Sequence, residues 1–283
     1  MPSRRHPTQR QRRLGIELRK LREAAKLSAP EAGASVGIKG YQISHLEAGR
    51  VGIQPSRLRA LVDRYGCADE ALVDGLVGLA DERDKYWWDE YRNALPGFFL
   101  DIAELEWNAE RLRNALTSHI PGLLQTEDHA RAIFGMVIPE LTAEEVDVRV
   151  AHRLKRREVL DRKNPPAYDA IIHESALRMQ FGGRGVARAQ LESLLEFGER
   201  DLVSLRVIPF AAGGFPGAGQ TILYAGAAVQ QLDTVQLDTS YGSVFLDSDE
   251  QLANYRRLFS KMELYALDEP SSRQFIHTIA QQL

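Results

Sequence analysis

The segment "SAPEAGASVGIKGYQISHLEAGR", residues 28–50, decides the fold of the N-terminal part of the chain. Ser28 can cap a helix, Pro30 suits the first turn, and Glu31 can bond back to the backbone N–H of the cap. Gly37 is suited to the positive φ that ends a helix and redirects the chain. The segment therefore predicts a helix that starts at Ser28, a short turn and a second helix.

Small and apolar residues predict how these two helices pack. Gly33 lies within the first helix and lets a neighbouring helix approach closely. Ile43 and Leu46 are three residues apart, so they share the inward face of the second helix, which Gly49 stops. The outward face of that helix then carries Tyr41, Ser44 and His45, which together with Gln42 are the candidates to read bases.

The sequence on both sides of this segment is also helical. Leucines recur at helical spacing from Leu14 to Leu21, and the positions between them are rich in Arg and Lys, which predicts a basic amphipathic first helix. The stretch "QPSRLRALVDRYG", residues 54–66, predicts a further helix, and a fifth is expected around residues 69–84. An all-α N-terminal domain over residues 10–84 follows.

The charge of the chain is divided unevenly. Residues 1–66 carry 14 Lys and Arg against 5 Asp and Glu, a net charge of +9, whereas the remainder carries 22 against 34, a net charge of −12. This asymmetry favours a polyanion as the partner of the first part. The single Cys67 excludes an internal disulfide framework, and no apolar run is long enough to cross a membrane, so we expect a cytoplasmic protein.

The residues of the N-terminal quarter resemble helix-turn-helix regulators of the phage-repressor and XRE type. The motif of that family usually ends in Ser-x-Leu/Ile-Glu-x-Gly-Arg/Lys, and this chain has "SHLEAGR" at residues 44–50. The resemblance covers about residues 10–80. Two positions depart from it: Lys39 replaces a common Ser or Thr cap, and Ala29 replaces a Gln that often binds phosphate.

The resemblance implies that the second helix of the motif enters the major groove of double-stranded DNA, and that the protein is a homodimer. Gln42 can pair with adenine, His45 can donate to guanine or to a phosphate, and Tyr41 can contact a phosphate or a thymine methyl group. These side chains are equally consistent with solvated residues that contact no base. The candidates for phosphate contacts are Arg12, Arg13, Arg19, Lys39 and Arg50. The basic residues 1–9 are expected to form a disordered tail or an arm that touches DNA.

The remainder, residues 85–283, predicts an α/β domain with a small mixed sheet. Residues 103–116 and 142–162 have helical patterns, and the "KRRE" run at residues 155–158 reads as a solvated face. After about residue 165 the pattern alternates between short strands and helices, with strands over 168–173, 203–210, 221–226 and 235–239. A closing helix is expected over residues 250–265.

Several stretches of this part resemble the C-terminal domain of WhiJ-like actinobacterial regulators. They are "WWDEY" (87–91), "IPGLLQTEDHARAIF" (120–134), "HESALRMQFGG" (173–183) and "VIPFAAGGFPGAG" (207–219). The resemblance implies an antitoxin-like transcription regulator that is paired with a small acidic protein. An interaction protein that neutralises such a partner and regulates only its own promoter is the alternative.

The sequence gives little sign of catalysis, a metal or a cofactor. His173-Glu174 begins like a zinc-protease motif, but Leu177 stands where the second histidine is needed. Residues 213–219 are glycine-rich but lack the Gly-Lys-Ser/Thr ending of a phosphate-binding loop. We therefore expect a regulator and not an enzyme. A ligand or partner site could use the residues Trp87, Trp88, His173, Glu174 and Phe215, although the tryptophans are also suited to packing between domains.

Overall fold

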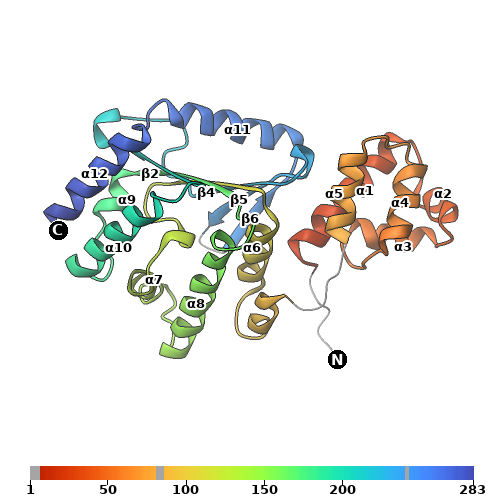
Figure 1. The fold of residues 1–283 in the computed structure, drawn as a ribbon. Helices are drawn as coiled ribbons and strands as arrows, with labels where there is room; N and C mark the ends of the chain where they lie inside the picture. The colour runs from red at the N-terminus through yellow and green to blue at the C-terminus, as the bar shows by residue number, and fades with distance from the viewer. Residues whose placement is uncertain (1–6, 81–85, 240–241) are drawn as a thin grey trace. The chain divides into compact units, whose positions relative to one another are not determined.

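The computed structural model describes residues 7–80, 86–239 and 242–283 (Figure 1). Residues 1–6 of the expected tail and residues 81–84 of the expected fifth helix lie outside the described residues. The chain forms two units: a helical unit of residues 1–89 and 227–232, and a second unit of residues 90–226 and 233–283. The all-α region followed by an α/β domain with a mixed sheet confirms the predicted fold class.

The helices of the N-terminal unit pack around one apolar core. They are α1 (Gln9–Ala24), α2 (Ala29–Ser35), α3 (Gly40–Glu47), α4 (Pro55–Arg64) and α5 (Glu70–Ala80). Leu18, Ile43, Leu58 and Leu76 are completely buried in this core. Helix α1 begins before the leucine pattern does, because Thr8 and Gln11 form a capping box at its start.

The C-terminal unit is built on a mixed sheet. In the described part of the chain the sheet has six strands in the order β3-β2-β1-β4-β5-β6. The strands are β1 (Arg111–Leu116), β2 (Ala167–His173), β3 (Val203–Ile208), β4 (Ile222–Gly226), β5 (Thr234–Thr239) and β6 (Gly242–Leu246). Pairing is parallel among β1, β2 and β3 and antiparallel among β1, β4, β5 and β6. Strand β1 therefore lies where the direction of pairing changes.

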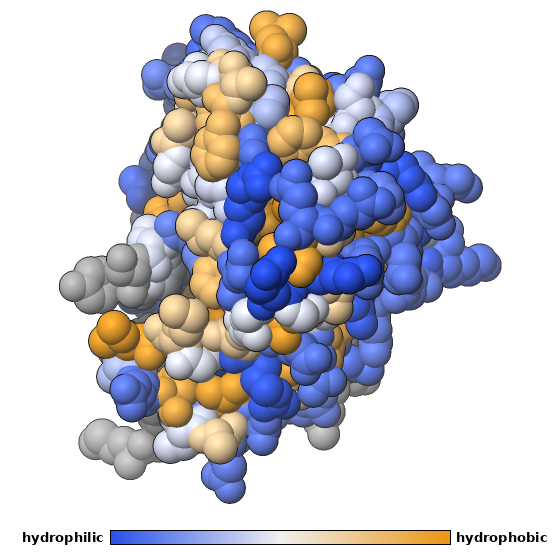
Figure 2. Space-filling view, turned by 90° about the vertical axis from the view of Figure 1, so that its left-hand side faces the viewer, coloured by the Kyte–Doolittle hydropathy of each residue, from blue (hydrophilic) through white to orange (hydrophobic). Residues whose placement is uncertain are grey.

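Helices cover both faces of this sheet (Figure 1). They are α6 (Gly97–Asn108), α7 (Glu127–Phe134), α8 (Ala143–Arg156), α9 (Glu174–Arg178), α10 (Arg184–Phe197), α11 (Asp249–Glu263) and α12 (Glu269–Gln282). Helix α11 packs against one face through Leu252, Phe259 and Met262. The opposite face is buried under α9, α10, α12 and the 3-10 turn η2 (Gly122–Leu124). On the side drawn in Figure 2, hydrophobic side chains form separate groups among hydrophilic ones.

The structure corrects two expectations for the first part of this unit. The pattern over residues 103–116 suggested one helix, but α6 ends at Asn108 and β1 follows. Strand β1 is hydrogen-bonded to a strand on each side, so tertiary pairing decides its conformation. The "KRRE" run is not a wholly solvated face, because Arg156 is buried. Strand β6 and helix α12 were not predicted. Among the described residues, no helix is long and apolar enough to span a membrane.

Candidate nucleic-acid interface and a polar pocket

Helices α2 and α3 form a helix-turn-helix whose turn is fixed by the residues of the motif. The Ser28 N–H donates to the Glu31 carboxylate at 2.8 Å, and the Glu31 N–H donates to Ser28 Oγ at 3.4 Å. A Cβ atom at Gly33 would lie 2.5 Å from the Ile38 carbonyl oxygen, so a larger residue does not fit there. Gly37 and Gly49 have φ values of 70° and 68°, which favour glycine.

Helix α3 is held against α1 by contacts that span a long stretch of sequence. Ile43 and Leu46, on the inward face of α3, are buried. A Cβ atom at Gly15 of α1 would lie 2.4 Å from the Glu47 carbonyl oxygen, so glycine is needed where the two helices meet. Arg22 donates from Nε and Nη2 to the two carboxylate oxygens of Glu47 at 2.6 and 2.9 Å. The roles of Gly15 and Arg22 were missed, because neither residue stands out in a local pattern.

The outward face of α3 is polar and exposed. Tyr41 is 59% exposed, and its ring meets the His45 ring edge-on with the ring centroids 5.9 Å apart. Ser44 Oγ donates to the Gly40 carbonyl oxygen at 3.3 Å. Gln42 Oε1 accepts from the Lys39 N–H at 2.9 Å, which is the bond that the third helical residue makes to the cap in a capping box. One half of the Gln42 amide is thus engaged in the unbound protein.

Four of the five proposed phosphate contacts have exposed side chains, and one does not. The exposed residues are Arg12, Arg19, Lys39 and Arg50. Arg13 is 3% exposed and donates to Glu17 at 2.6 Å and to the Gln231 carbonyl oxygen, with Lys20 also bonded to Glu17. Burial alone would raise the pKa of Glu17, but these donors hold it below its ordinary value. The expectation for Arg13 is corrected: its guanidinium neutralises a buried carboxylate and is not available to a phosphate.

A hollow of about 510 Å³ borders the outward face of α3. Tyr41, Gln42 and His45 line one side of it, and Gln54 and Arg57 at the start of α4 line the other. Arg57 is exposed, and its position beside the motif was not predicted. The hollow therefore joins the base-reading candidates to the N-terminus of α4, where backbone N–H groups and a cation favour an anion.

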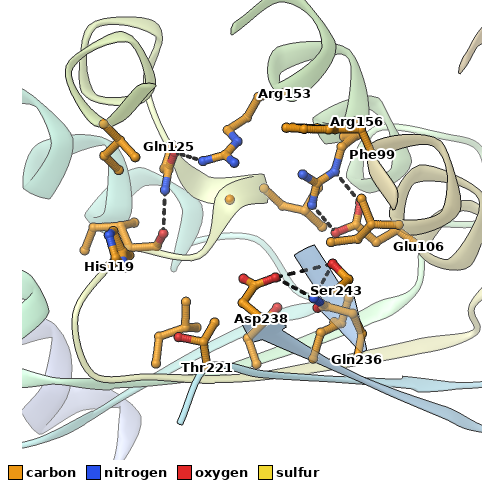
Figure 3. Close-up of a pocket in the computed structure, with 18 of the residues that line it drawn as sticks. Phe99, Glu106, His119, Gln125, Arg153, Arg156, Thr221, Gln236, Asp238 and Ser243 are labelled. Carbon is orange, nitrogen blue, oxygen red and sulfur yellow. Dashed lines mark hydrogen bonds and ion pairs between the residues drawn. The ribbon is translucent and has the colours of Figure 1, made fainter. Parts of the chain in front are cut away.

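The C-terminal unit contains a pocket of about 240 Å³ above the sheet (Figure 3). Its floor includes Asn114 on β1, Leu223 on β4 and Gln236 on β5, which are aligned across three adjacent strands. The neighbouring residues Ala115 and Val235 face the core under α11. Because side chains alternate across a strand, Asn114 and Gln236 face the pocket on the side of the sheet opposite to α11.

The roof of the pocket holds two arginines of α8 that are three residues apart. Arg156 donates from Nε and Nη2 to Glu106 of α6 at 2.8 and 2.6 Å, and both side chains are buried. Burial lowers the pKa of Arg156, but the adjacent carboxylate outweighs it and raises the pKa. Arg153 instead donates from Nη1 to Gln125 Oε1 at 2.6 Å. Burial lowers the pKa of Arg153 to about 9, with a further decrease from the charge of Arg156.

The opposite side of the pocket carries a carboxylate. Asp238 at the end of β5 accepts through Oδ1 from Gln236 Nε2 at 2.5 Å, and it lies across the open space from Arg153 (Figure 3). Within the described chain no ion pair joins Asp238 to Arg153. His119 also lines the pocket, and burial lowers its pKa. Sequence reasoning missed this pocket entirely.

The residues suggested for a ligand or partner site fall in two different units. Trp87 and Trp88 belong to the N-terminal unit, where Trp88 stacks on Tyr86 at 4.4 Å. In the C-terminal unit His173 contacts Phe215, with ring centroids 5.3 Å apart. None of the five suggested residues lines the polar pocket. The Glu174 carboxylate is held by Arg178 at 2.7 Å and by the Phe210 N–H at 2.7 Å. Among the described residues no group of three or more His, Cys, Asp or Glu could hold a metal ion.

Comparisons with known families agree with this division. The model of a helix-turn-helix domain matches residues 13–76. Together with the exposed polar face of α3, this match supports a DNA-binding regulator rather than an enzyme. A second model, described as Domain of unknown function (DUF5753), matches residues 99–278. The chain belongs to this DUF5753 family. Neither the curated proteins nor the solved structures gave a match.

Proposed function

We propose that the protein is a sequence-specific transcriptional regulator of the XRE type, which binds double-stranded DNA as a homodimer. The observation that carries the proposal is the exposed polar face of α3, held by a helix-turn-helix that the family comparison also supports. In this mode α3 enters the major groove and α2 lies across the backbone. Half-sites about one helical turn apart are then expected for the dimer.

The division of labour on the N-terminal unit follows from exposure and charge. Tyr41, Gln42, Ser44 and His45 are the candidates for base contacts. Arg12, Arg19, Lys39 and Arg50 are suited to phosphates, which position the protein and make its affinity depend on salt. The acidic C-terminal domain then receives a signal, from a small molecule or a protein, that changes the affinity for DNA.

Gel-shift titrations with the promoter region of the protein's own gene test this proposal. Arg50→Ala should weaken binding at every sequence and reduce the salt slope by about 1. Gln42→Ala should instead weaken binding mainly to the preferred site. Arg188→Ala, which removes an exposed arginine from α10, is the matched control and should bind as the wild type does. Equal binding by all four proteins would count against α3 as the reading helix.

A second candidate is an antitoxin-like protein of the WhiJ-like group that neutralises a small acidic partner. The loop between α7 and α8 favours a protein contact, because Met136 is 68% exposed and Ile138 is 91% exposed. Co-expression with the neighbouring small open reading frame, followed by purification, should give a stable complex that Ile138→Asp weakens. Recovery of the protein without a partner would leave the regulator as the better reading.

A further inference from the structure

The two arginines of the pocket roof differ in what compensates their charge. Arg156 has a carboxylate on its Nε–Nη2 edge, whereas Arg153 has a neutral amide oxygen on Nη1 and lies over the Phe134 ring at 4.4 Å. In the described chain Arg153 Nε is buried and has no hydrogen-bond partner. A guanidinium with unused donors in an enclosed site is costly, and a carboxylate is the group that best satisfies it. At the roof of the pocket, the guanidinium of Arg153 therefore has no carboxylate partner among the described residues.

The remaining charges restrict which anion fits. Glu106 is already neutralised by Arg156, so Arg153 and Asp238 are left as single, opposite charges on two sides of the pocket. A doubly charged phosphate would gain one arginine and be repelled by Asp238. A singly charged carboxylate near Arg153 avoids that penalty. A protonated amine at the far end of the same molecule would pair with Asp238.

The walls and the size of the pocket restrict the part of the ligand that lies between its two charged ends. Phe98, Phe99 and Ile102 of α6 and Leu223 of β4 supply apolar surface to the pocket. A volume of about 240 Å³ lies just below the range of about 300–1,000 Å³ that is usual for small-molecule pockets. The fit is to a compact metabolite with a hydrocarbon or aromatic middle, and a folded peptide segment is too large.

We propose that this pocket is the signal-receiving site of the C-terminal domain, and that it binds a small zwitterion with a carboxylate at one end and an amine at the other. Arg153 holds the carboxylate, Asp238 holds the amine, and the α6 aromatic residues pack on the middle of the molecule. This inference deepens the proposed function, because it names the class of signal that the regulator receives.

Thermal-shift and calorimetric titrations of the full chain test the inference with defined probes. The probes are ω-amino acids from 4-aminobutyrate to 8-aminooctanoate and the rigid aromatic zwitterion 4-(aminomethyl)benzoate. Hexanoate, hexylamine and inorganic phosphate are the comparators. At least one zwitterion should raise the melting temperature in a concentration-dependent way and bind at least about tenfold more tightly than either one-ended comparator. No binding by any zwitterion, or tighter binding of phosphate, would overturn the inference.

Variants assign the two ends of the ligand. Asp238→Asn keeps the size of the side chain and should reduce zwitterion affinity at least about tenfold while leaving hexanoate unchanged. Arg153→Met should abolish the response to both. Lys155→Met removes one positive charge from the same helix outside the pocket and should bind the zwitterion as the wild type does. If Arg153→Met fails to fold, the Asp238→Asn result still decides: an unchanged zwitterion affinity contradicts the assignment.

The same samples separate this inference from the proposed function. A zwitterion that binds and changes the gel shift supports both. Binding of a zwitterion without any DNA binding leaves the pocket site intact and defeats the proposed regulator. DNA binding without binding of any zwitterion supports the proposed regulator and overturns the inference about the pocket.

Discussion

Helix α3 and the pocket of the C-terminal unit both gather polar side chains, but they hold them in opposite ways. The α3 side chains are exposed, and two of them bond to the backbone of their own first turn. The two pocket arginines are buried or half-buried, and they pair with side chains of other elements that are distant in the sequence. Exposed groups on α3 can therefore change without loss of the fold, whereas a change at Glu106 leaves the buried Arg156 without its partner.

Among the variants that test this contrast, Glu106→Gln should change the free energy of unfolding most. The substitution keeps the shape of the side chain but leaves the buried Arg156 guanidinium without its counter-charge. We expect a loss of about 3–5 kcal/mol in the free energy of unfolding of the C-terminal unit, measured by urea denaturation. Glu192→Gln breaks an exposed pair with Arg188 and should cost less than about 1 kcal/mol. Similar losses in the two variants would remove the distinction between the pocket and an ordinary surface.

Low pH should destabilise the C-terminal unit through His152, a buried histidine on α8 next to the pocket arginines. Burial lowers the pKa of His152 to about 3 from 6.5, with further decreases from Arg156 and Arg153. The unfolded chain therefore binds a proton between these pH values and the folded chain does not, so stability present above pH 6.5 is lost as the pH falls toward 3. At pH 4 this one histidine should cost about 3 kcal/mol.

Urea unfolding at pH 7 and pH 4 checks this expectation. His152→Phe, whose ring can keep the edge contacts with Tyr91 and Phe99, should lose less stability between the two pH values than the wild type. His277→Phe changes an exposed histidine of α12 and serves as the control. If His152→Phe lost as much free energy of unfolding between pH 7 and pH 4 as the wild type, His152 would not be the cause of the acid sensitivity.

Gly15→Ala tests whether the exposed face of α3 depends on a buried contact behind it. The added Cβ would lie 2.4 Å from the Glu47 carbonyl oxygen, so α1 and α3 must separate. A loss of about 1–3 kcal/mol in the N-terminal unit is expected, with weaker DNA binding. The control Gly78→Ala places a methyl group in open space on α5 and should stabilise by about 0.5–1 kcal/mol. Circular dichroism during heating compares the two variants.

The same contrast explains what the sequence could predict. The helix-turn-helix is encoded by neighbours: Ser28 and Glu31 cap α2, Gly37 turns the chain, and Ile43 and Leu46 are three residues apart. Local spacing is therefore enough to predict its fold and its outward face. Arg13 was misjudged because its burial depends on packing by residues 227–232, more than two hundred positions away.

The pocket could not be predicted in this way. Glu106 and Arg156 are fifty residues apart, and Asp238 is brought opposite Arg153 by the order of strands in the sheet. In the sequence Arg156 stands in a charged run that resembles any solvated helix face. The run over residues 111–116 was read as helix for the same reason, since the partners on both sides of β1 are distant in sequence.

The smallest expected effect on stability separates the two roles of Gln42. Its Oε1 caps α3, whereas pairing with adenine needs both the oxygen and the Nε2 donor. Gln42→Glu keeps an acceptor for the Lys39 N–H and adds a negative charge at a helix N-terminus, so the free energy of unfolding should stay level or rise by about 0.3–1 kcal/mol. The carboxylate cannot donate to adenine and is repelled by phosphates, so affinity for the preferred site should fall at least about tenfold. Unfolding and gel-shift titrations of one sample give both values. If Gln42→Glu bound DNA as tightly as the wild type, Gln42 would be a cap alone and base reading would pass to Tyr41, Ser44 and His45.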